Sequence, residues 1–349
     1  MGLGPFDHPW LSGLFADEAM VAIWSAEKTL QHMLSFECAW SRSLGVAGLC
    51  DCTEAQAAAE AIECASIDLT SLHKGTARDG VPVPDLVAQL KKVTDSGAVH
   101  IGATSQDVVD TSLVLVLRDT SDLITRRLQD LIAQIDTLEN RFGDASLMGR
   151  TRMQAATPIT VRDRLQSWRL PLQSHCLRLE NLRPTIEKVQ IGGASGDRAA
   201  LGNHAQTVVA EVAAALGLAP TQRCWHAMRD SVVEYASFLS LVSGTLGKMG
   251  QDVALMSQQG IEEIATIGGG NSSAMAHKQN PVLAELLITI ARFNAVQVSG
   301  MHQAMVHEQE RSGSAWSLEW MILPQMALAT GRSLAAGSEI CRSIIRLGG

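Results

Sequence analysis

The sequence is poor in aromatic residues other than tryptophan and has no surplus of positive charge. Only one tyrosine and six phenylalanines occur in 349 residues, and the formal net charge is −8. Nucleic-acid binding needs a surplus of lysine and arginine on the contacting face, so we expect no nucleic-acid partner. The acidic balance is still compatible with a local basic pocket for a small anion.

Signals for secretion and for a membrane span are also missing. Residues 1–10 carry Pro5, Asp7 and Pro9 and lack a basic segment that leads into an apolar one. No apolar run reaches the roughly 18 residues that suggest a membrane span. We therefore expect a cytoplasmic protein with no membrane partner.

Paired cysteine motifs are absent. The seven cysteines form neither a Cys-x-x-Cys motif nor the paired spacing of a zinc site, and His302, His307 and Glu308 do not form His-Glu-x-x-His. No acidic cluster has the spacing of metal ligands. We expect reduced, packed thiols and no bound metal.

What the sequence does contain is a strong helical pattern. Alanine, leucine, glutamine and glutamate recur at spacings of three and four, and Leu113 to Leu138 form one apolar stripe with charges between them. Long helices need partners along their whole length, so we predict an all-α bundle with almost no sheet. The predicted long helices cover about 110–141, 161–187, 203–216, 228–264, 281–308 and 318–346.

The first hundred residues differ from the remainder. They show shorter helical patterns and a polar, turn-rich stretch over 72–84, which we expect to be a loop. The pattern of long helices begins near 104–110. We therefore predict an N-terminal helical domain at 1–105 and a central long-helix bundle domain at 106–349.

One glycine-rich segment stands between two long helical patterns. Residues 268–281 read Gly-Gly-Gly-Asn-Ser-Ser-Ala-Met-Ala-His-Lys-Gln-Asn-Pro. Such a loop can expose backbone donors to an anion and move as a lid. A plain connector, in which Ser273 or Asn280 caps the next helix, would have much the same sequence. The residues alone leave both interpretations open.

This segment resembles the signature Gly-Ser-Ser-x-Met-Pro-x-Lys-x-Asn-Pro of the fumarase/aspartase superfamily. Asn271 stands where glycine is usual and Ala276 where proline is usual, but neither change removes a reacting side chain. The residues that fit the signature are Ser272, Ser273, Met275, Lys278, Asn280 and Pro281.

Two further segments resemble superfamily regions and occur in the same order. Residues 100–111 include Thr104-Ser105-Gln-Asp107, and residues 149–158 read Gly-Arg-Thr-Arg-Met-Gln-Ala-Ala-Thr-Pro. In the second segment Arg152 replaces a histidine that assists proton transfer in most superfamily lyases. Arginine stays protonated and is no general base, but it can clamp a carboxylate.

Loss of this histidine is also found in the muconate-lactonizing branch of the superfamily. Residues 77–84 and 307–320 are similar to stretches of that branch. The resemblance implies a homotetramer whose central bundle consists of long helices and whose active sites each take residues from three subunits. It also implies that a small C-terminal domain of the relatives is missing or truncated here.

The same resemblance implies a reaction. A carboxylate of a small tricarboxylate, 3-carboxy-cis,cis-muconate, adds to a conjugated double bond and forms 4-carboxymuconolactone, a step in protocatechuate degradation, without a cofactor. It assigns proton transfer to Ser272 and binding of the carboxylate that becomes the enolate to Lys278 and Asn280. The expected substrate-binding residues are Thr104, Ser105, Arg152, Gln154, Ser273, Met275 and Arg311.

Several side chains keep alternative interpretations. His73 and His100 lie beside polar stretches and are possible acid/base residues. Trp320 is expected to pack in the core, while the role of Trp316 stays open. The remaining lone histidines are expected to be satisfied surface or core groups; they are His32, His175 and His226.

Two alternatives apply to the whole chain. The first is another superfamily lyase such as adenylosuccinate lyase, which Arg152 disfavours. The second is a non-catalytic helical scaffold, because a fold does not by itself imply an activity. Retention of Ser272, Lys278 and Asn280 disfavours the scaffold.

Overall fold

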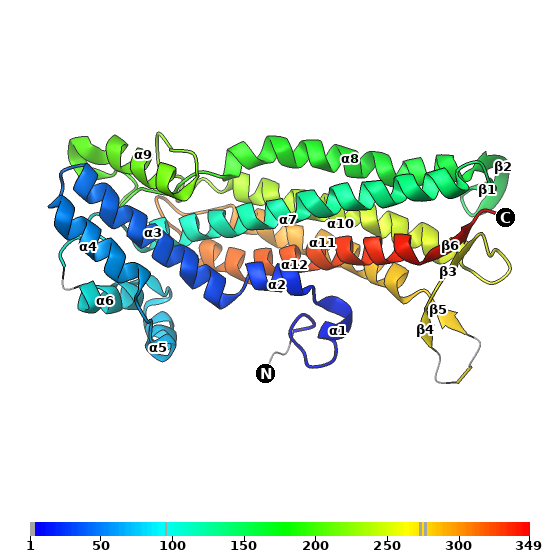
Figure 1. The fold of residues 1–349 in the computed structure, drawn as a ribbon, viewed down its shortest axis with the longest axis horizontal. Coiled ribbons are helices and arrows are strands. Elements are labelled where there is room, and N and C mark those ends of the chain that lie inside the picture. Colours follow the sequence, from blue (N-terminus) through cyan, green and yellow to red (C-terminus); the bar gives the residue numbers. More distant parts are fainter. Residues whose placement is uncertain (1–3, 95, 272–273, 276–277) are drawn as a thin grey trace.

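The computed structural model describes residues 4–94, 96–271, 274–275 and 278–349. This part of the chain forms an elongated bundle of long helices (Figure 1). The longest helix, α7, has 38 residues, so it spans about 57 Å at 1.5 Å per residue. The long helices are α7 (Ser105–Phe142), α8 (Val161–Ile186), α10 (Asp230–Met256), α11 (Val282–Ala304) and α12 (Ser314–Ser343).

Helix α7 begins at a capping box and buries the predicted apolar stripe. The backbone N–H of Thr104 donates to Oδ2 of Asp107 at 3.0 Å, which satisfies a free donor at the helix start. Leu117, Leu128 and Leu131 are fully buried along the helix. The predicted stripe is therefore the face on which α8 and α12 pack.

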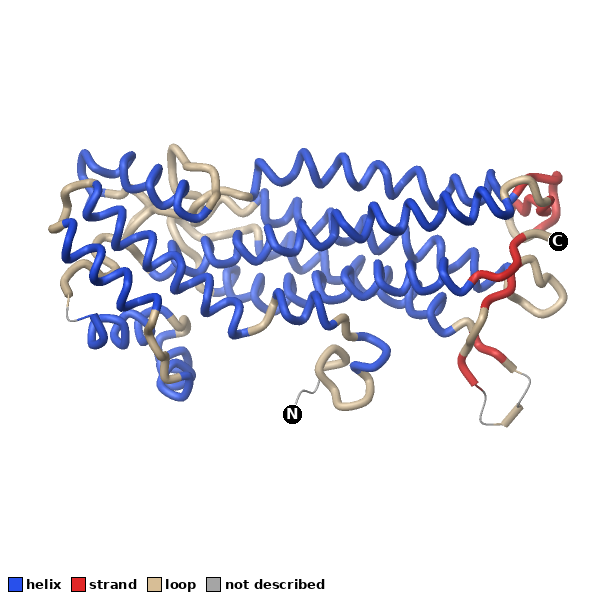
Figure 2. Tube along the Cα trace, in the orientation of Figure 1, coloured by secondary structure: helices blue, strands red, loops and turns tan. Residues whose placement is uncertain are grey.

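The bundle continues by antiparallel returns of the chain. A hairpin of β1 (Ser146–Thr151) and β2 (Gln154–Thr160) joins α7 to α8. Helix α10 then packs on α8, α11 and α12. Two other short ribbons lie at the same end as the hairpin, where Figure 2 shows all the strands. They pair β3 (Ile264–Thr266) with β6 (Ile344–Leu347), and β4 (Gly270–Asn271) with β5 (Gln279–Asn280).

Most of the shorter helices gather at the opposite end of the bundle (Figure 1). Helix α3 packs on α4, α7 and α9, and its Trp40 is fully buried with Nε1 donating to the carbonyl of Ile101 at 3.0 Å. The shorter elements are α1 (Ser12–Phe15), α2 (Glu18–Ile23), α3 (Ala26–Val46), α4 (Cys52–Glu63), α5 (Leu69–Asp79), α6 (Val83–Thr94), η1 (Ala199–His204) and α9 (Ala205–Leu216).

The predicted all-α class is confirmed, but some of the local predictions are wrong. The stretch over 72–84 is helical for most of its length, because α5 ends at Asp79 and α6 starts at Val83. Gly80 ends α5 with a φ of 73°, and Asp68, which precedes the stretch, caps the start of α5 by accepting from two backbone N–H groups.

Two further differences concern helix ends and the small amount of sheet. The helix predicted over 228–264 ends at Met256, where the chain turns towards β3. The motif over 149–158 lies in a β-hairpin, for which no prediction was made. Division of the chain into domains at 105/106 stays a prediction, although α7 begins at Ser105.

Candidate active site

The structure separates the predicted site residues into two groups at opposite ends of the bundle. The first group surrounds the start of α7 and includes Thr104, Ser105 and Arg311. The second group belongs to the hairpin and ribbon end, which carries Arg152 and Lys278 (Figure 1). Since α7 alone is about 57 Å long, one small substrate cannot contact both groups of a single chain.

The first group is organised by the carboxylate of Asp107, which is fully buried. Its oxygens accept from the backbone N–H groups of Thr104, Gly192 and Gly193 at 2.8–3.0 Å. Oδ1 also lies 2.8 Å from Nε2 of His226. One carboxylate therefore joins the start of α7 to the glycine-rich loop at 192–196.

A second buried carboxylate lies one helical turn further along α7. Asp110 accepts from both terminal nitrogens of Arg229, Nη1 and Nη2, at 2.7 and 3.2 Å. Arg229 also donates to Glu319 of α12 from Nε and Nη2. Burial opposes the charge of Arg229, but Asp110 and Glu319 outweigh it and raise its pKa. Trp316 donates from Nε1 to Asp110 at 3.0 Å, so it supports this network.

Arg311 is bonded to the same network, but its guanidinium is not neutralised by a carboxylate of the described residues. Its Nε donates to Oε1 of the buried Gln106 at 3.0 Å, and its NH2 group donates to the carbonyls of Gly193 and Ala194 at 3.3 and 3.2 Å. These acceptors are neutral, and no carboxylate pairs with Arg311 within the described ranges. An exposed guanidinium of this kind suits a substrate carboxylate.

The second group begins with the β4–β5 ribbon. Gly270 pairs with Asn280 and Asn271 pairs with Gln279, so Asn280 is held directly before α11. Asn280 lines a cavity of about 370 Å³ together with Gly268 and Gly270. Lys278 and Met275 are exposed beside it. The predicted residues Ser272 and Ser273 lie outside the described residues.

The hairpin of β1 and β2 supplies positive charge at this end. Arg152 and Met153 form its two-residue turn with φ values of 49° and 67°. Left-handed values at both central positions are typical of a type I′ turn and cost energy for residues other than glycine. A cavity of about 400 Å³ is lined by Arg150, Arg152 and Arg164, and Gln154 ends the turn.

The two histidines considered as acid/base residues differ in environment. His100 has a left-handed φ of 59°, and its Nδ1 lies 2.6 Å from Oε1 of the fully buried Glu37. His73 is exposed on α5 and makes no hydrogen bond or ion pair with the part of the chain that is described. Both lie at the end of the bundle that carries the first group, because His73 is on α5 and His100 shortly precedes α7 (Figure 1).

Some residues of the first group were not among the predicted site residues. They are Gln106, Asp107, Asp110, His226, Arg229 and Glu319. His226 was expected to be an ordinary satisfied histidine; its Nε2 is paired with Asp107, but its Nδ1 has no hydrogen-bond partner among the described residues. The available signal was the spacing of Asp107 and Asp110, two acids one turn apart and shortly before the wholly apolar run over 113–117.

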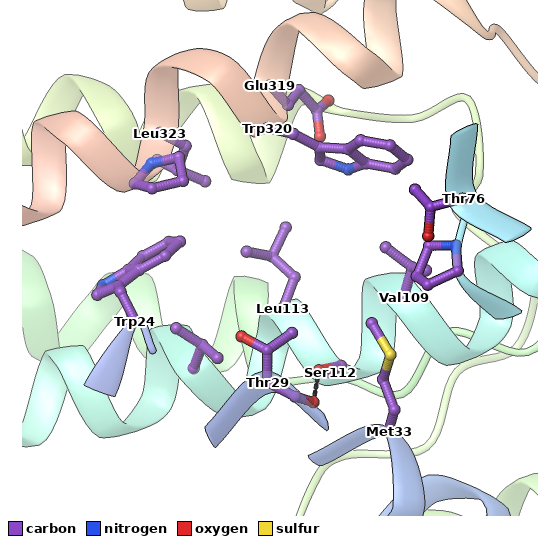
Figure 3. A pocket seen from close by; sticks show the side chains of 13 residues that line it. Trp24, Thr29, Met33, Thr76, Val109, Ser112, Leu113, Glu319, Trp320 and Leu323 are labelled. Atoms are coloured by element: carbon purple, nitrogen blue, oxygen red, sulfur yellow. Dashed lines mark hydrogen bonds between the residues drawn. The ribbon is translucent and has the colours of Figure 1, made fainter. Parts of the chain in front are cut away.

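An apolar cavity of about 300 Å³ lies next to this network but is unsuited to a tricarboxylate (Figure 3). Trp24 and Trp320 lie on its opposite sides, with Leu113 between them, and Leu323 also lines it. Its one carboxylate, Glu319, is already paired with Arg229. Trp320 was expected in the core but is only partly buried, because it borders this cavity and packs edge-on against Trp316.

The described residues hold no group of three histidine, cysteine or acidic side chains that could bind a metal ion. All seven cysteines are free thiols. Cys38 and Cys341 are buried, Cys50 and Cys176 pack against the core and Cys224 is partly buried, so the expectation of packed thiols is wrong only for the exposed Cys52 and Cys64.

Comparisons with known proteins show relatives that match most of the chain. Residues 14–300 match a family model described as lyase. The chain is 39% identical over 339 residues to 3-carboxy-cis,cis-muconate cycloisomerase of Pseudomonas putida, which covers 95% of this chain and 80% of that protein. It is 31% identical to N-acetyl-S-(2-succino)cysteine lyase of Enterococcus italicus, covering 96% and 75% of the two chains.

A solved structure shares the fold closely. The crystal structure of 3-carboxy-cis,cis-muconate lactonizing enzyme from Pseudomonas putida superposes with a TM-score of 0.90 and 37% identity. The match covers 97% of this chain and 77% of that structure. The chain therefore belongs to the lyase family whose model it matches, and it has the fumarase/aspartase-like fold.

Proposed function

We propose that this protein is a 3-carboxy-cis,cis-muconate cycloisomerase that acts in protocatechuate degradation. The observation that carries the proposal is the likeness to cycloisomerases of this name over almost the whole chain. Arg152 at the hairpin turn supports it, because a permanently charged side chain suits a carboxylate ligand and cannot act as a base. A cytoplasmic location is the accompanying expectation.

The reaction forms one carbon–oxygen bond and one carbon–hydrogen bond. A substrate carboxylate oxygen attacks the conjugated double bond and closes a five-membered lactone, while the carbon next to another carboxylate gains a proton. We assign the proton transfer to Ser272 and the binding of the enolate-forming carboxylate to Lys278 and Asn280. Intramolecular attack makes orientation the largest contribution, and fixed positive charge stabilises the enolate.

The two groups of site residues meet only if different chains supply them. We propose a homotetramer in which antiparallel neighbours bring the ribbon end of one chain to the α7 start of another. Helix α11 offers an apolar face for this contact, since it is the one described helix long and apolar enough to cross a membrane, yet only 28% of its most apolar window is buried. Val296 on this helix is 72% exposed.

The first prediction concerns this assembly. Multi-angle light scattering of the purified chain at micromolar concentration is expected to give four times the mass of 37.3 kDa. An exposed apolar helix face of this length is stabilised by burial against other copies. A stable monomer would contradict the shared site, because no single chain holds both groups together.

The second prediction concerns Arg311. Arg311→Ala is expected to raise KM by about 10- to 100-fold, since a charge-assisted hydrogen bond contributes roughly 1.5–3 kcal/mol. Thermal stability should change little, because its present acceptors are neutral groups. Steady-state kinetics and a melting curve measure the two effects, with Arg78→Ala on the exposed α5 pair as control. A lower Tm with an unchanged KM would make Arg311 a structural residue only.

Two substrates separate the proposed reaction from its nearest alternative. The purified protein should remove the conjugated absorbance of 3-carboxy-cis,cis-muconate and release no fumarate from adenylosuccinate. Fumarate release with no loss of muconate absorbance would favour an ordinary lyase. Absence of both signals in a folded tetramer would favour the non-catalytic scaffold.

A further inference from the structure

Three side chains next to the first group form an ordered series of acid, imidazole and thiol. Asp107 and His226 are at most 1% exposed, and Oδ1 of the acid lies 2.8 Å from Nε2 of the ring. The other ring nitrogen, Nδ1, has no hydrogen-bond partner among the described residues. Cys224 lies beside this side of the ring, because a Cβ atom at Gly192 would meet both Cε1 of His226 and Cβ of Cys224.

The electrostatics of this series favour an ionised sulfur. Burial alone would lower the pKa of His226, but its contacts with Asp107 and Cys224 outweigh burial and raise it to about 9. The contact with His226 in turn lowers the pKa of the Cys224 thiol, against the opposing effects of burial and of Asp107. Thiolates, rather than thiols, are the reactive form of cysteine.

Cys224 differs in this respect from the other cysteines that have a perturbed pKa. Burial raises the pKa of the Cys38 and Cys341 thiols to about 12. It also raises the pKa of Cys50 and Cys176. Cys224 alone in this set has a lowered pKa, and it is partly exposed.

The backbone of the 192–196 loop lies directly on this thiol. A Cβ atom at Gly196, where φ is 81°, would come within 2.6 Å of the sulfur. A Cβ atom at Gly192 would come within 2.7 Å of Cβ of Cys224 and 2.6 Å of Cε1 of His226. Only glycine fits at both positions, so an atom added to the sulfur cannot be accommodated without a shift of the loop or the side chain.

The same loop is connected to the proposed substrate-binding residues. The carbonyls of Gly193 and Ala194 accept from Arg311, and the N–H of Gly193 donates to Asp107, which also holds Thr104. A shift of the loop would therefore reach both the guanidinium and the start of α7.

We propose that Cys224 is a modifiable thiol that hydroperoxides oxidise to a sulfenate, and that this oxidation displaces the 192–196 loop and withdraws Arg311 from the substrate. The thiolate sulfur attacks one peroxide oxygen, forming an S–O bond as the O–O bond breaks. Sulfur loses two electrons and the peroxide gains them. The transferred oxygen keeps its hydrogen, so the first product is the sulfenic acid, which ionises to the sulfenate. The hydroxide that leaves takes the proton of the His226 imidazolium and becomes water.

Cys224 is only partly exposed, so a small oxidant reaches its sulfur more easily than a large one. Hydrogen peroxide has two heavy atoms and reaches a thiol between a ring and a glycine loop more readily than a bulky disulfide does. A sulfenate is reversible: one low-molecular-weight thiol displaces water to form a mixed disulfide, and a second thiol releases Cys224 and a symmetric disulfide. The effect on activity rests on the proposed function, whereas the chemistry of the thiol does not.

The chemical test uses the purified full-length protein and hydrogen peroxide. Sulfenate is trapped with dimedone and located by mass spectrometry, with Cys64, an exposed cysteine, as the internal control. We expect Cys224 to react at least about 10-fold faster than Cys64 at neutral pH, because its thiolate is stabilised. Reaction of Cys224 at or below the rate of Cys64 would overturn the proposal.

Two variants and one pH series complete the test. His226→Gln should reduce the rate at Cys224 to that at Cys64. If this variant does not fold, alkylation of the wild-type protein by iodoacetamide replaces it, and the Cys224 rate must fall less between pH 9 and pH 7 than the Cys64 rate. Equal falls at the two cysteines would overturn the assignment.

The coupling to the site is measured separately. Peroxide should increase hydrogen exchange of the Gly192 and Gly193 amides and raise KM for the muconate, and dithiothreitol should reverse both effects. Cys224→Ser should keep full activity and be insensitive to peroxide. Loss of activity in Cys224→Ser on the same treatment would overturn the coupling. If the untreated protein does not turn over the muconate, the proposed function fails, while trapping and exchange still decide this proposal.

Discussion

Ser272→Ala is expected to lower the turnover number by about 10²–10⁴-fold, the usual contribution of one positioned acid or base, while the tetramer stays folded. A serine hydroxyl is a weak proton shuttle in water, so it needs nearby positive charge and a site from which water is excluded. Lys278, which directly precedes β5, is exposed and can supply that charge. Lys278→Met should therefore be comparably damaging.

A matched serine distinguishes chemistry from a general effect on this end of the bundle. Ser257 borders the same cavity as Asn280, and its hydroxyl donates to the Ala254 carbonyl. Ser257→Ala should keep near-normal turnover at saturating substrate. Normal turnover in Ser272→Ala, combined with a large loss in His100→Ala or His73→Ala, would transfer the proton step to a histidine and remove the assignment to Ser272.

Arg229→Met is expected to lower the free energy of unfolding by about 3–5 kcal/mol, because it leaves two buried carboxylates without their cation. Asp110 and Glu319 are at most 1% exposed, and both bond to this guanidinium. Methionine keeps an unbranched apolar stem in place of the arginine stem, so the lost charge and hydrogen bonds dominate the effect. Urea denaturation at one fixed protein concentration measures it, since subunit association adds to apparent stability.

Arg78→Ala is the control for this variant. Arg78 pairs with Asp79 on the surface of α5, and its side chain is 70% exposed. Such a pair contributes about 0–1 kcal/mol, so the urea midpoint should hardly move. Equal midpoints for Arg229→Met and the wild-type protein would contradict the view that the Asp110 network fixes the first group.

The long helices were predictable from sequence because each carries a continuous apolar stripe. The stripe along α7 contains Leu117, Leu128 and Leu131, and all three are buried. Caps were harder to recognise. The polar and turn residues over 72–84 indicated a loop, whereas most of them belong to α5 and α6, which pack on each other.

The candidate site was predictable only in part, since motifs identify residues but not how distant segments meet. Arg152 and Lys278 belong to the end of the bundle opposite Thr104, which no local pattern indicates (Figure 1). The role of His226 was likewise invisible in sequence, because Asp107 lies 119 residues away from it along the chain.

The most direct test of the account is activity in mixed tetramers. One variant carries Ser105→Ala with Arg311→Ala and the other carries Ser272→Ala; the two are co-expressed with different tags, and hybrids are purified through both. If each site combines the α7 start of one chain with the ribbon end of another, about one quarter of the sites in a random 1:1 hybrid are intact. The account predicts that hybrids convert 3-carboxy-cis,cis-muconate at up to about a quarter of the wild-type rate. Hybrid activity no higher than the mean of the two parent variants would contradict it.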